Sequence, residues 1–312
     1  MRRLVSVEGR PGLDGQHQNA ERVVRSILPY DDMPDLTPVP NSSTEHVLLP
    51  QEHFNWLHAN NPRLFRHRLG AARGGVQDFW EKLLATPDGP ELWARNPFLN
   101  GRTLADLRWC VPLVVHDDAG PINKNMSAYS RNFFGLLGSG PEVEARFLIS
   151  TEVKNMSEFD DHSWPRILQS FEALANQGAD DNHWGGILLF VSADLEYACN
   201  DLGLPHFNGR NMCSWCWANT SYLPHTDYSD GALWRGTLVD NAVFMNRVRR
   251  PLHPLVDHPW FCIFSYRLDL LHLWDHHGVL SDITANVFWT HLSRANDILP
   301  GANQDCDHHY YN

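Results

Sequence analysis

The 312-residue sequence lacks the features that mark several large classes of proteins. No run of apolar residues approaches the ~18 that a membrane-spanning helix needs, and the first residues do not form a secretory signal. The glycine-rich loops G-x-x-x-x-G-K-S/T and G-x-G-x-x-G and the G-x-S-x-G turn are also missing. We therefore expect a soluble protein without membrane partners, and we exclude nucleotide-cofactor enzymes and serine hydrolases as first choices.

Basic residues are fewer than acidic ones, 25 against 37, and the net charge is −12. The deficit lies in residues 111–312, which hold 12 basic and 24 acidic side chains. Because an acidic surface repels phosphate, binding of nucleic acid has to rest on local features. The one dense basic cluster, Arg247, Arg249 and Arg250, is the candidate contact for nucleic acid. The alternative is an ordinary solvated surface.

The chain divides by composition into four parts. Residues 1–45 are polar and rich in proline, which predicts a disordered arm or linker. Residues 46–105 carry aromatic residues at helical spacing and predict three short helices. Residues 106–204 alternate between apolar strands and helical patterns, and residues 205–312 combine a cysteine pair with a helical segment that we expect over 267–280.

The part from residue 106 to 204 predicts a mixed α/β fold. Its order is three strands, a helix, an interior strand and a second helix. We expect these elements at residues 111–115, 127–137, 144–153, 160–175, 187–191 and 195–202. The first strand runs into His116-Asp117-Asp118, and the interior strand ends just before Asp194.

Asp118 and Asp194 form the first candidate site. Ligand sites of open sheets lie just beyond the carboxyl ends of strands, so the two carboxylates could meet there. Two hard oxygen ligands suit Mg²⁺ or Mn²⁺, and such a pair can hold two metals about 3.5–4 Å apart for phosphodiester chemistry. The alternative is that both are ordinary strand-end residues, with Asp194 capping the helix that follows it.

Cysteine is scarce, with six residues in the chain, which is typical of a reducing compartment. Cys213-Ser-Trp-Cys216 is the one C-x-x-C pair, and two thiolates at this spacing converge on a Zn²⁺ ion. Two more ligands are needed. The best candidates are His272 with either His276 or His277, because residues three to five apart share a helix face. His206 and His225 are nearer in sequence and remain alternatives.

Three segments in order carry a family resemblance: residues 111–120 (VPLVVHDDAG), residues 192–205 (SADLEYACNDLGLP) with the pair 213–216, and residues 269–279 (DLLHLWDHHGV). Together they resemble the transposase-like proteins of large DNA mobile elements in dinoflagellate-type genomes. They are also distantly similar to DDE transposases with an RNase H-like catalytic fold.

The resemblance implies a specific site. In DDE transposases the first acid lies on the first strand, which corresponds to Asp118, and the second follows the fourth strand, which corresponds to Asp194. The V(D)J recombinase, a relative of such enzymes, pairs a C-x-x-C with two histidines on zinc, and this pattern corresponds to the cysteine and histidine candidates above. The resemblance also implies DNA transposon ends as substrate, a nuclear location and a possible homo-oligomer.

Departures from the family pattern leave two functions open. Asp117 and Ala193 stand where glycines are expected before the two acids, and no glutamate follows His277 to serve as the third acid. The first function is therefore a fragment of a polynucleotidyl transferase, truncated or inactive, that uses two metals to cleave or join DNA; whether a third acid lies beyond residue 312 stays open. The second is a zinc-stabilised, non-enzymatic protein derived from a transposase. A metal-dependent phosphohydrolase built on His116-Asp117 with His272 and Asp275 is a weaker third, because enzymes of that type place the His-Asp pair on helices.

Overall fold

The computed structural model describes part of the chain and divides it into two compact units, Met1–Arg267 and Leu268–Asn312. The described residues are 37–38, 46–123, 126–139, 146–153, 159–178, 183–206, 208–227 and 229–268. All of them except Leu268 belong to the first unit.

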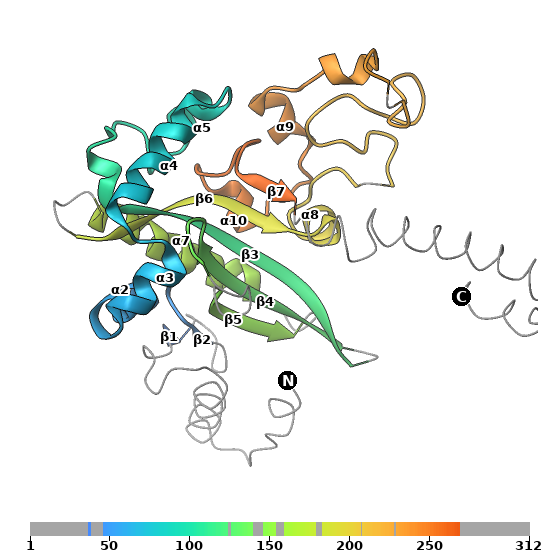
Figure 1. Cartoon of the computed structure of the whole chain (residues 1–312). Coiled ribbons are helices and arrows are strands. Elements are labelled where there is room, and N and C mark those ends of the chain that lie inside the picture. Colours follow the sequence, from blue (N-terminus) through green and yellow to red (C-terminus); the bar gives the residue numbers. More distant parts are fainter. Residues whose placement is uncertain are drawn as a thin grey trace, which may run out of the picture. The chain divides into compact units, whose positions relative to one another are not determined.

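The fold is mixed α/β, with helices that flank a five-stranded sheet (Figure 1). The strands are β1 (Thr37–Pro38), β2 (His46–Val47), β3 (Cys110–Asn123), β4 (Met126–Gly135), β5 (Phe147–Val153), β6 (Gly185–Ala193) and β7 (Tyr266–Leu268). The α-helices are α2 (Pro50–Asn60), α3 (Pro62–Leu69), α4 (Arg73–Ala85), α5 (Gly89–Arg95), α7 (Phe159–Gln177), α8 (Leu195–Asn200), α9 (Asn241–Arg247) and α10 (Pro254–Asp257). Two 3-10 helices are η1 (Asp106–Trp109) and η2 (Leu233–Gly236).

The large sheet has the strand order β5-β4-β3-β6-β7, and β1 and β2 form a separate two-stranded pair. Within the sheet, β3 runs antiparallel to β4, β4 runs antiparallel to β5, and β3 runs parallel to its other neighbour, β6. The helix α7 lies between β5 and β6 in sequence, as a parallel pair requires a crossover connection. The predicted order of three strands, a helix, an interior strand and a helix is therefore confirmed.

The core forms where α7 packs against the sheet. The predicted apolar stripe of this helix is buried, and Phe171 within it meets Phe133 of β4 edge-on, with ring centroids 6.0 Å apart. His53 of α2 packs edge-on against the same Phe133 and against Phe147 of β5. These aromatic contacts bury large apolar areas and bring α2 and α7 to the same face of the sheet.

Residues 46–105 form four α-helices rather than the three that the sequence predicted. The additional helix is α5, which has a proline, Pro90, in its first turn, where a missing N–H removes no hydrogen bond; Pro50 and Pro62 begin α2 and α3 in the same way. The side chain of Asn61, between α2 and α3, accepts a hydrogen bond from the N–H of Leu64 at 3.1 Å and caps α3.

Residues outside the sheet form hydrogen bonds with the edge of β6 where β7 does not pair with it. The indole Nε1 of Trp260 and the amide Nδ2 of Asn96 both donate to the carbonyl of Leu188, at 2.6 and 3.1 Å. Further along, the N–H of Val191 donates to the carbonyl of Ser265 at 2.8 Å. These bonds satisfy backbone groups that an open strand edge would offer to another chain.

One predicted helix begins differently. The sequence predicted a helix over 267–280, but Arg267 lies in the edge strand β7. Its guanidinium lies over the ring of Phe190 in β6, 4.6 Å from the centroid, so packing on the neighbouring strand fixes it there. The rest of that segment, including His272, His276 and His277, lies outside the described residues.

Candidate functional site

Asp118 and Asp194 each lie shortly after the end of the parallel pairing between β3 and β6. In the parallel pair of β3 and β6, His116 is the partner of Ser192. Asp118 lies two residues after His116, and Asp194 lies two residues after Ser192, directly before α8 (Figure 1). Neighbouring strands are about 4.8 Å apart, so the two aspartates each follow a residue of a closely spaced pair. The side chain of Asp118 lies outside the described part, so the meeting of the two carboxylates stays a prediction.

Asp194 has a clear local role. It is the N-cap of α8, with extended backbone angles (φ −70°, ψ 172°), and its carboxylate accepts a hydrogen bond from the N–H of Tyr197 at 2.6 Å. The sequence left the capping role open as an alternative, and the structure confirms that Asp194 caps α8. A cap of this kind satisfies one of the unpaired N–H groups at the helix start and fixes the carboxylate at the end of β6.

Asp117, the neighbour of Asp118, belongs to a buried ion pair. Its Oδ2 lies 2.7 Å from the Nε of Arg131 on β4, and both side chains are 0% exposed. The hydroxyl of Tyr197 donates to the same oxygen at 2.7 Å. Because a buried charge without a partner is very unfavourable, Arg131 is what allows aspartate at position 117.

The arginine of this pair is held on several sides. Arg131 donates to the hydroxyl of Ser163 at 3.3 Å, and its guanidinium lies 5.1 Å from the ring of Trp164, also in α7. Tyr129, two residues before it on β4, donates to Asp201 at 2.6 Å. The result is a polar cluster midway along β3, to which α7 and α8 contribute side chains.

Tyr197 connects the two strand ends. Its backbone N–H donates to Asp194 after β6, and its hydroxyl donates to Asp117 in β3. Its ring also meets the ring of Tyr129 edge-on, with centroids 5.9 Å apart. Sequence reasoning missed this residue and Arg131. The one available signal was the charged Arg131 in the middle of a predicted strand.

His116 and Asp117 do not form a common site. Asp117 is used by Arg131 and Tyr197, whereas His116 lies 3.1 Å from the guanidinium of Arg146. Successive residues of a strand point to opposite faces, so the two side chains cannot chelate one metal as they could on a helix. This geometry argues against the phosphohydrolase alternative.

Cys213 and Cys216 are both free thiols, the second one buried. Burial, together with contact with the Cys213 thiol, raises the pKa of the Cys216 thiol to about 11. The N–H of Ala218 donates to its sulfur at 3.4 Å. The thiol of Cys216 is therefore protonated at neutral pH, and a Zn²⁺ ion would have to displace that proton.

The structure does not add further ligands to these thiols. Within the described residues, no three His, Cys, Asp or Glu side chains gather as a metal site, so neither His206 nor His225 completes the cysteine pair. His272, His276 and His277 were the main candidates and lie outside the described part.

The basic cluster divides into different environments. Arg247, at the end of α9, donates to the carbonyls of Cys213 and Cys216 at 3.0 and 2.9 Å and is half-buried. The exposed Arg249 donates to the carbonyl of Asn200, and Arg250 is exposed. Arg247 therefore holds the loop of residues 213–216 (the cysteine loop) in place, whereas Arg249 and Arg250 face solvent.

No protein-family model matches the sequence, and no curated protein and no solved structure matches the chain. Within the described part, none of the helices combines the length and the apolar character needed to cross a membrane.

Proposed function

We propose that the chain carries an RNase H-like core of the DDE transposase type, which cleaves or joins phosphodiester bonds of DNA with divalent metal. What supports this proposal is the register of β3 and β6, in which His116 pairs with Ser192, two residues before Asp118 and Asp194 respectively. The resemblance implies an acid on the first strand and another after the fourth. In the five-stranded sheet β3 is the first strand in sequence and β6 is the fourth.

The donors fit Mg²⁺ or Mn²⁺. Carboxylate oxygens are the ligands these hard cations prefer, and the Asp194 carboxylate is held, half-buried, at the end of β6. A bound pair of metals would activate the attacking oxygen and stabilise the leaving oxygen of the phosphodiester. The chain itself positions the ligands: the N–H of Tyr197 holds Asp194, and pairing with Ser130 of β4 holds the backbone of Asp118.

The aspartate at position 117 is compatible with this proposal. Its charge is neutralised by Arg131 and its Oδ2 also receives the hydroxyl of Tyr197, so it adds no uncompensated charge beneath the proposed metals. DNA transposon ends as substrate and a nuclear location follow from the same resemblance. Because no glutamate follows Glu196 in the sequence, metal binding and cleavage are tested separately.

Metal binding is tested by titration with Mn²⁺, followed by electron paramagnetic resonance of the free ion. Asp118→Asn and Asp194→Asn should weaken binding by more than the roughly 10–100-fold that loss of an outer-shell partner causes. Asparagine is also a good N-cap, so Asp194→Asn removes charge while it keeps the start of α8.

The matched control is Asp240→Asn. Asp240 is the N-cap of α9, with nearly the same backbone angles (φ −75°, ψ 172°), and it accepts the N–H of Val243 at 2.8 Å. This variant should bind Mn²⁺ like the parent chain. Absence of Mn²⁺ binding in the parent, or equal affinity in all four proteins, would remove the metal site.

Cleavage is tested by nicking of a supercoiled plasmid in the presence of Mn²⁺. Hydrolysis adds water across one phosphodiester bond and leaves a hydroxyl on one side and a phosphate on the other. The parent chain should nick faster than Asp118→Asn. Equal rates for the two proteins would refute the catalytic role while leaving the metal-binding result to stand by itself.

The second candidate is a zinc-stabilised protein without catalysis. Its supporting observation is that the Asp194 carboxylate already serves as a helix cap, which requires no metal. This candidate predicts one zinc per chain, carried by Cys213 and Cys216, and no binding of Mn²⁺. Elemental analysis should find less zinc in Cys213→Ser than in Cys262→Ser, which removes a free thiol elsewhere. Unchanged zinc in Cys213→Ser would exclude the proposed zinc ligand.

A further inference from the structure

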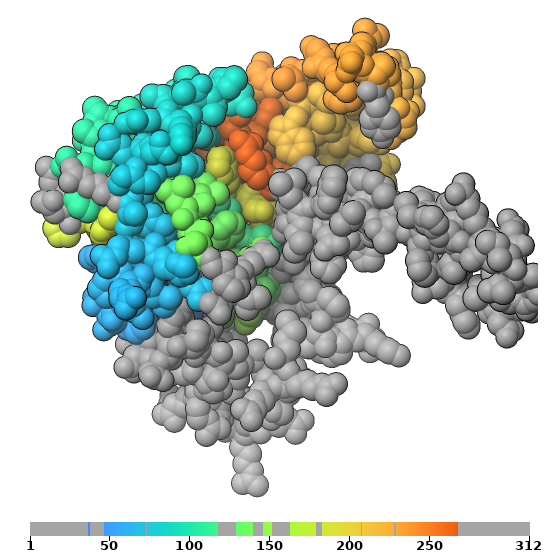
Figure 2. All heavy atoms as spheres, in the orientation of Figure 1, coloured from blue at the N-terminus to red at the C-terminus, as the bar shows by residue number. Residues whose placement is uncertain are grey.

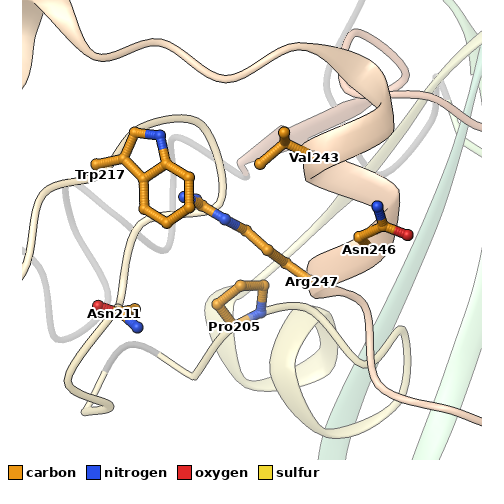
Figure 3. A pocket seen from close by; sticks show the side chains of 6 residues that line it. All are labelled: Pro205, Asn211, Trp217, Val243, Asn246 and Arg247. Carbon is orange, nitrogen blue, oxygen red and sulfur yellow. The ribbon is translucent and has the colours of Figure 1, made fainter.

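An open pocket of about 410 Å³ lies between the cysteine loop and α9. Its lining residues are Pro205, Asn211, Trp217, Val243, Asn246 and Arg247 (Figure 3). This volume falls in the range of small-ligand pockets, which combine apolar walls with a few placed polar groups. In the space-filling view, atoms of the surrounding segment, gold to orange, lie at the surface (Figure 2).

The pocket contains an aromatic ring that is held ready for stacking. Trp217 is 45% exposed, which is unusual for so large an apolar side chain, and the guanidinium of Arg247 lies 4.0 Å from its ring centroid. Arg247 is itself fixed by its bonds to the carbonyls of Cys213 and Cys216. A ligand that stacks here meets a preformed platform, so little ordering of side chains opposes binding.

Two amides complete the polar part of the pocket. Figure 3 shows Arg247 extending from α9 towards Trp217, with Asn211 and Asn246 on opposite sides of it. Neither amide is used as a hydrogen-bond partner within the part of the chain that the structure describes. Each therefore offers two donors and one acceptor oxygen to a ligand, which is the group that proteins use on the edges of bases.

The charge of this segment differs from the rest of the C-terminal part. Residues 205–250 hold five arginines and three acidic residues, whereas residues 111–312 hold 12 basic and 24 acidic side chains. The N–H of the exposed Arg249 donates to the carbonyl of Gly203 at 2.8 Å, two residues before Pro205 of the pocket. Phosphate groups near the pocket would thus meet a locally positive surface.

We propose that this pocket takes an unpaired nucleobase of single-stranded nucleic acid. The base stacks on Trp217, its edge bonds to Asn211 or Asn246, and the neighbouring phosphates approach Arg249 and Arg250. The choice of nucleic acid as ligand rests on the proposed function, and the pocket itself needs neither metal nor cleavage. Stacking on a single exposed aromatic ring favours bases that are already unpaired, because no unpairing energy opposes their entry.

The test measures fluorescence anisotropy of labelled single-stranded oligonucleotides, about 12 nucleotides long, in EDTA and at low salt. Trp217→Ala should weaken binding about 5- to 150-fold, the loss of one base stack worth about 1–3 kcal/mol. Trp217→Phe keeps a stacking ring and should recover part of the affinity. Tyr222→Ala removes an exposed aromatic residue outside the pocket and should bind like the parent chain.

Two outcomes would overturn the proposal: no binding of the oligonucleotides by the parent chain, or equal affinities for Trp217→Ala and Tyr222→Ala. Binding that depends on Trp217 in a chain that fails to bind Mn²⁺ would support the pocket and refute the proposed catalysis. Mn²⁺ binding without oligonucleotide binding would refute the pocket alone.

Discussion

The buried ion pair between Asp117 and Arg131 gives the sharpest test of how this fold is held together. The two side chains are 2.7 Å apart, and water reaches neither of them. Asp117→Ala leaves the guanidinium of Arg131 inside the protein without its carboxylate, beside the hydroxyl of Ser163 and the rings of Trp164 and Tyr129. Removal of one partner from a buried pair typically costs about 3–5 kcal/mol of unfolding free energy.

An exposed pair at the same distance provides the control. The Nζ of Lys82 and the Oδ2 of Asp78 are also 2.7 Å apart, but their side chains are 75% and 59% exposed. Solvent screens this pair, so Asp78→Ala should change the free energy of unfolding by about 0–1 kcal/mol. The comparison therefore varies burial while the distance between the charges stays constant.

Urea unfolding followed by circular dichroism measures both variants. With a slope of about 2 kcal/mol per molar urea, Asp117→Ala should lower the midpoint by about 1.5–2.5 M. The double variant Asp117→Ala/Arg131→Met removes both charges and should recover at least half of the loss, because an apolar replacement leaves no buried charge unpaired. Equal midpoints for Asp117→Ala and Asp78→Ala would refute the reasoning.

Three further predictions concern single residues. Tyr197→Phe removes the hydroxyl that donates to Asp117 and should cost about 1.5–3 kcal/mol of unfolding free energy, measured by urea unfolding. Burial lowers the pKa of His53 from 6.5 to about 4, so the unfolded chain binds the proton more tightly than the folded one. Stability should therefore fall by up to about 3 kcal/mol as the pH drops from about 6.5 to 4, and His53→Phe should lack this loss. Gly70 has a positive φ of 68°, and a Cβ there would collide with the backbone of Leu137, so Gly70→Ala should lower the melting temperature. Gly75→Ala should leave it unchanged or raise it, because a Cβ there meets no described atom within 4 Å.

The strands of the core were predictable because continuous apolar runs in the sequence indicate buried strands. Residues 111–115 and 187–191 both fall within strands, β3 and β6. Yet β3 continues to Asn123, well beyond its apolar part, because its polar residues pair with β4 in a long antiparallel ladder. Hydrophobic periodicity reports which residues are buried and carries no information about backbone pairing between polar ones.

The candidate site was predictable only in part, for a similar reason. The rule that strands deliver functional groups at their carboxyl ends holds for Asp194, which follows β6, but not for Asp118, because β3 continues to Asn123. The pairing of Asp117 with Arg131 depends on the register of β3 against β4, where these two residues are direct partners. A register is set by many backbone hydrogen bonds across the sheet, so sequence spacing could not supply this contact.

Tyr197 contacts both Asp117 and Asp194. The apolar pattern that predicted α8 did not indicate these contacts. The hydroxyl of Tyr197 donates to Asp117, and its N–H donates to Asp194. Aspartate at position 117 thus brings a structural link between β3 and α8 that glycine could not provide. If a related chain carries glycine at that position, we expect an uncharged residue at the position of Arg131, since the guanidinium would otherwise be buried without its carboxylate. A related chain with glycine at 117 and a buried arginine at 131 would contradict this explanation of the pair of Asp117 and Arg131.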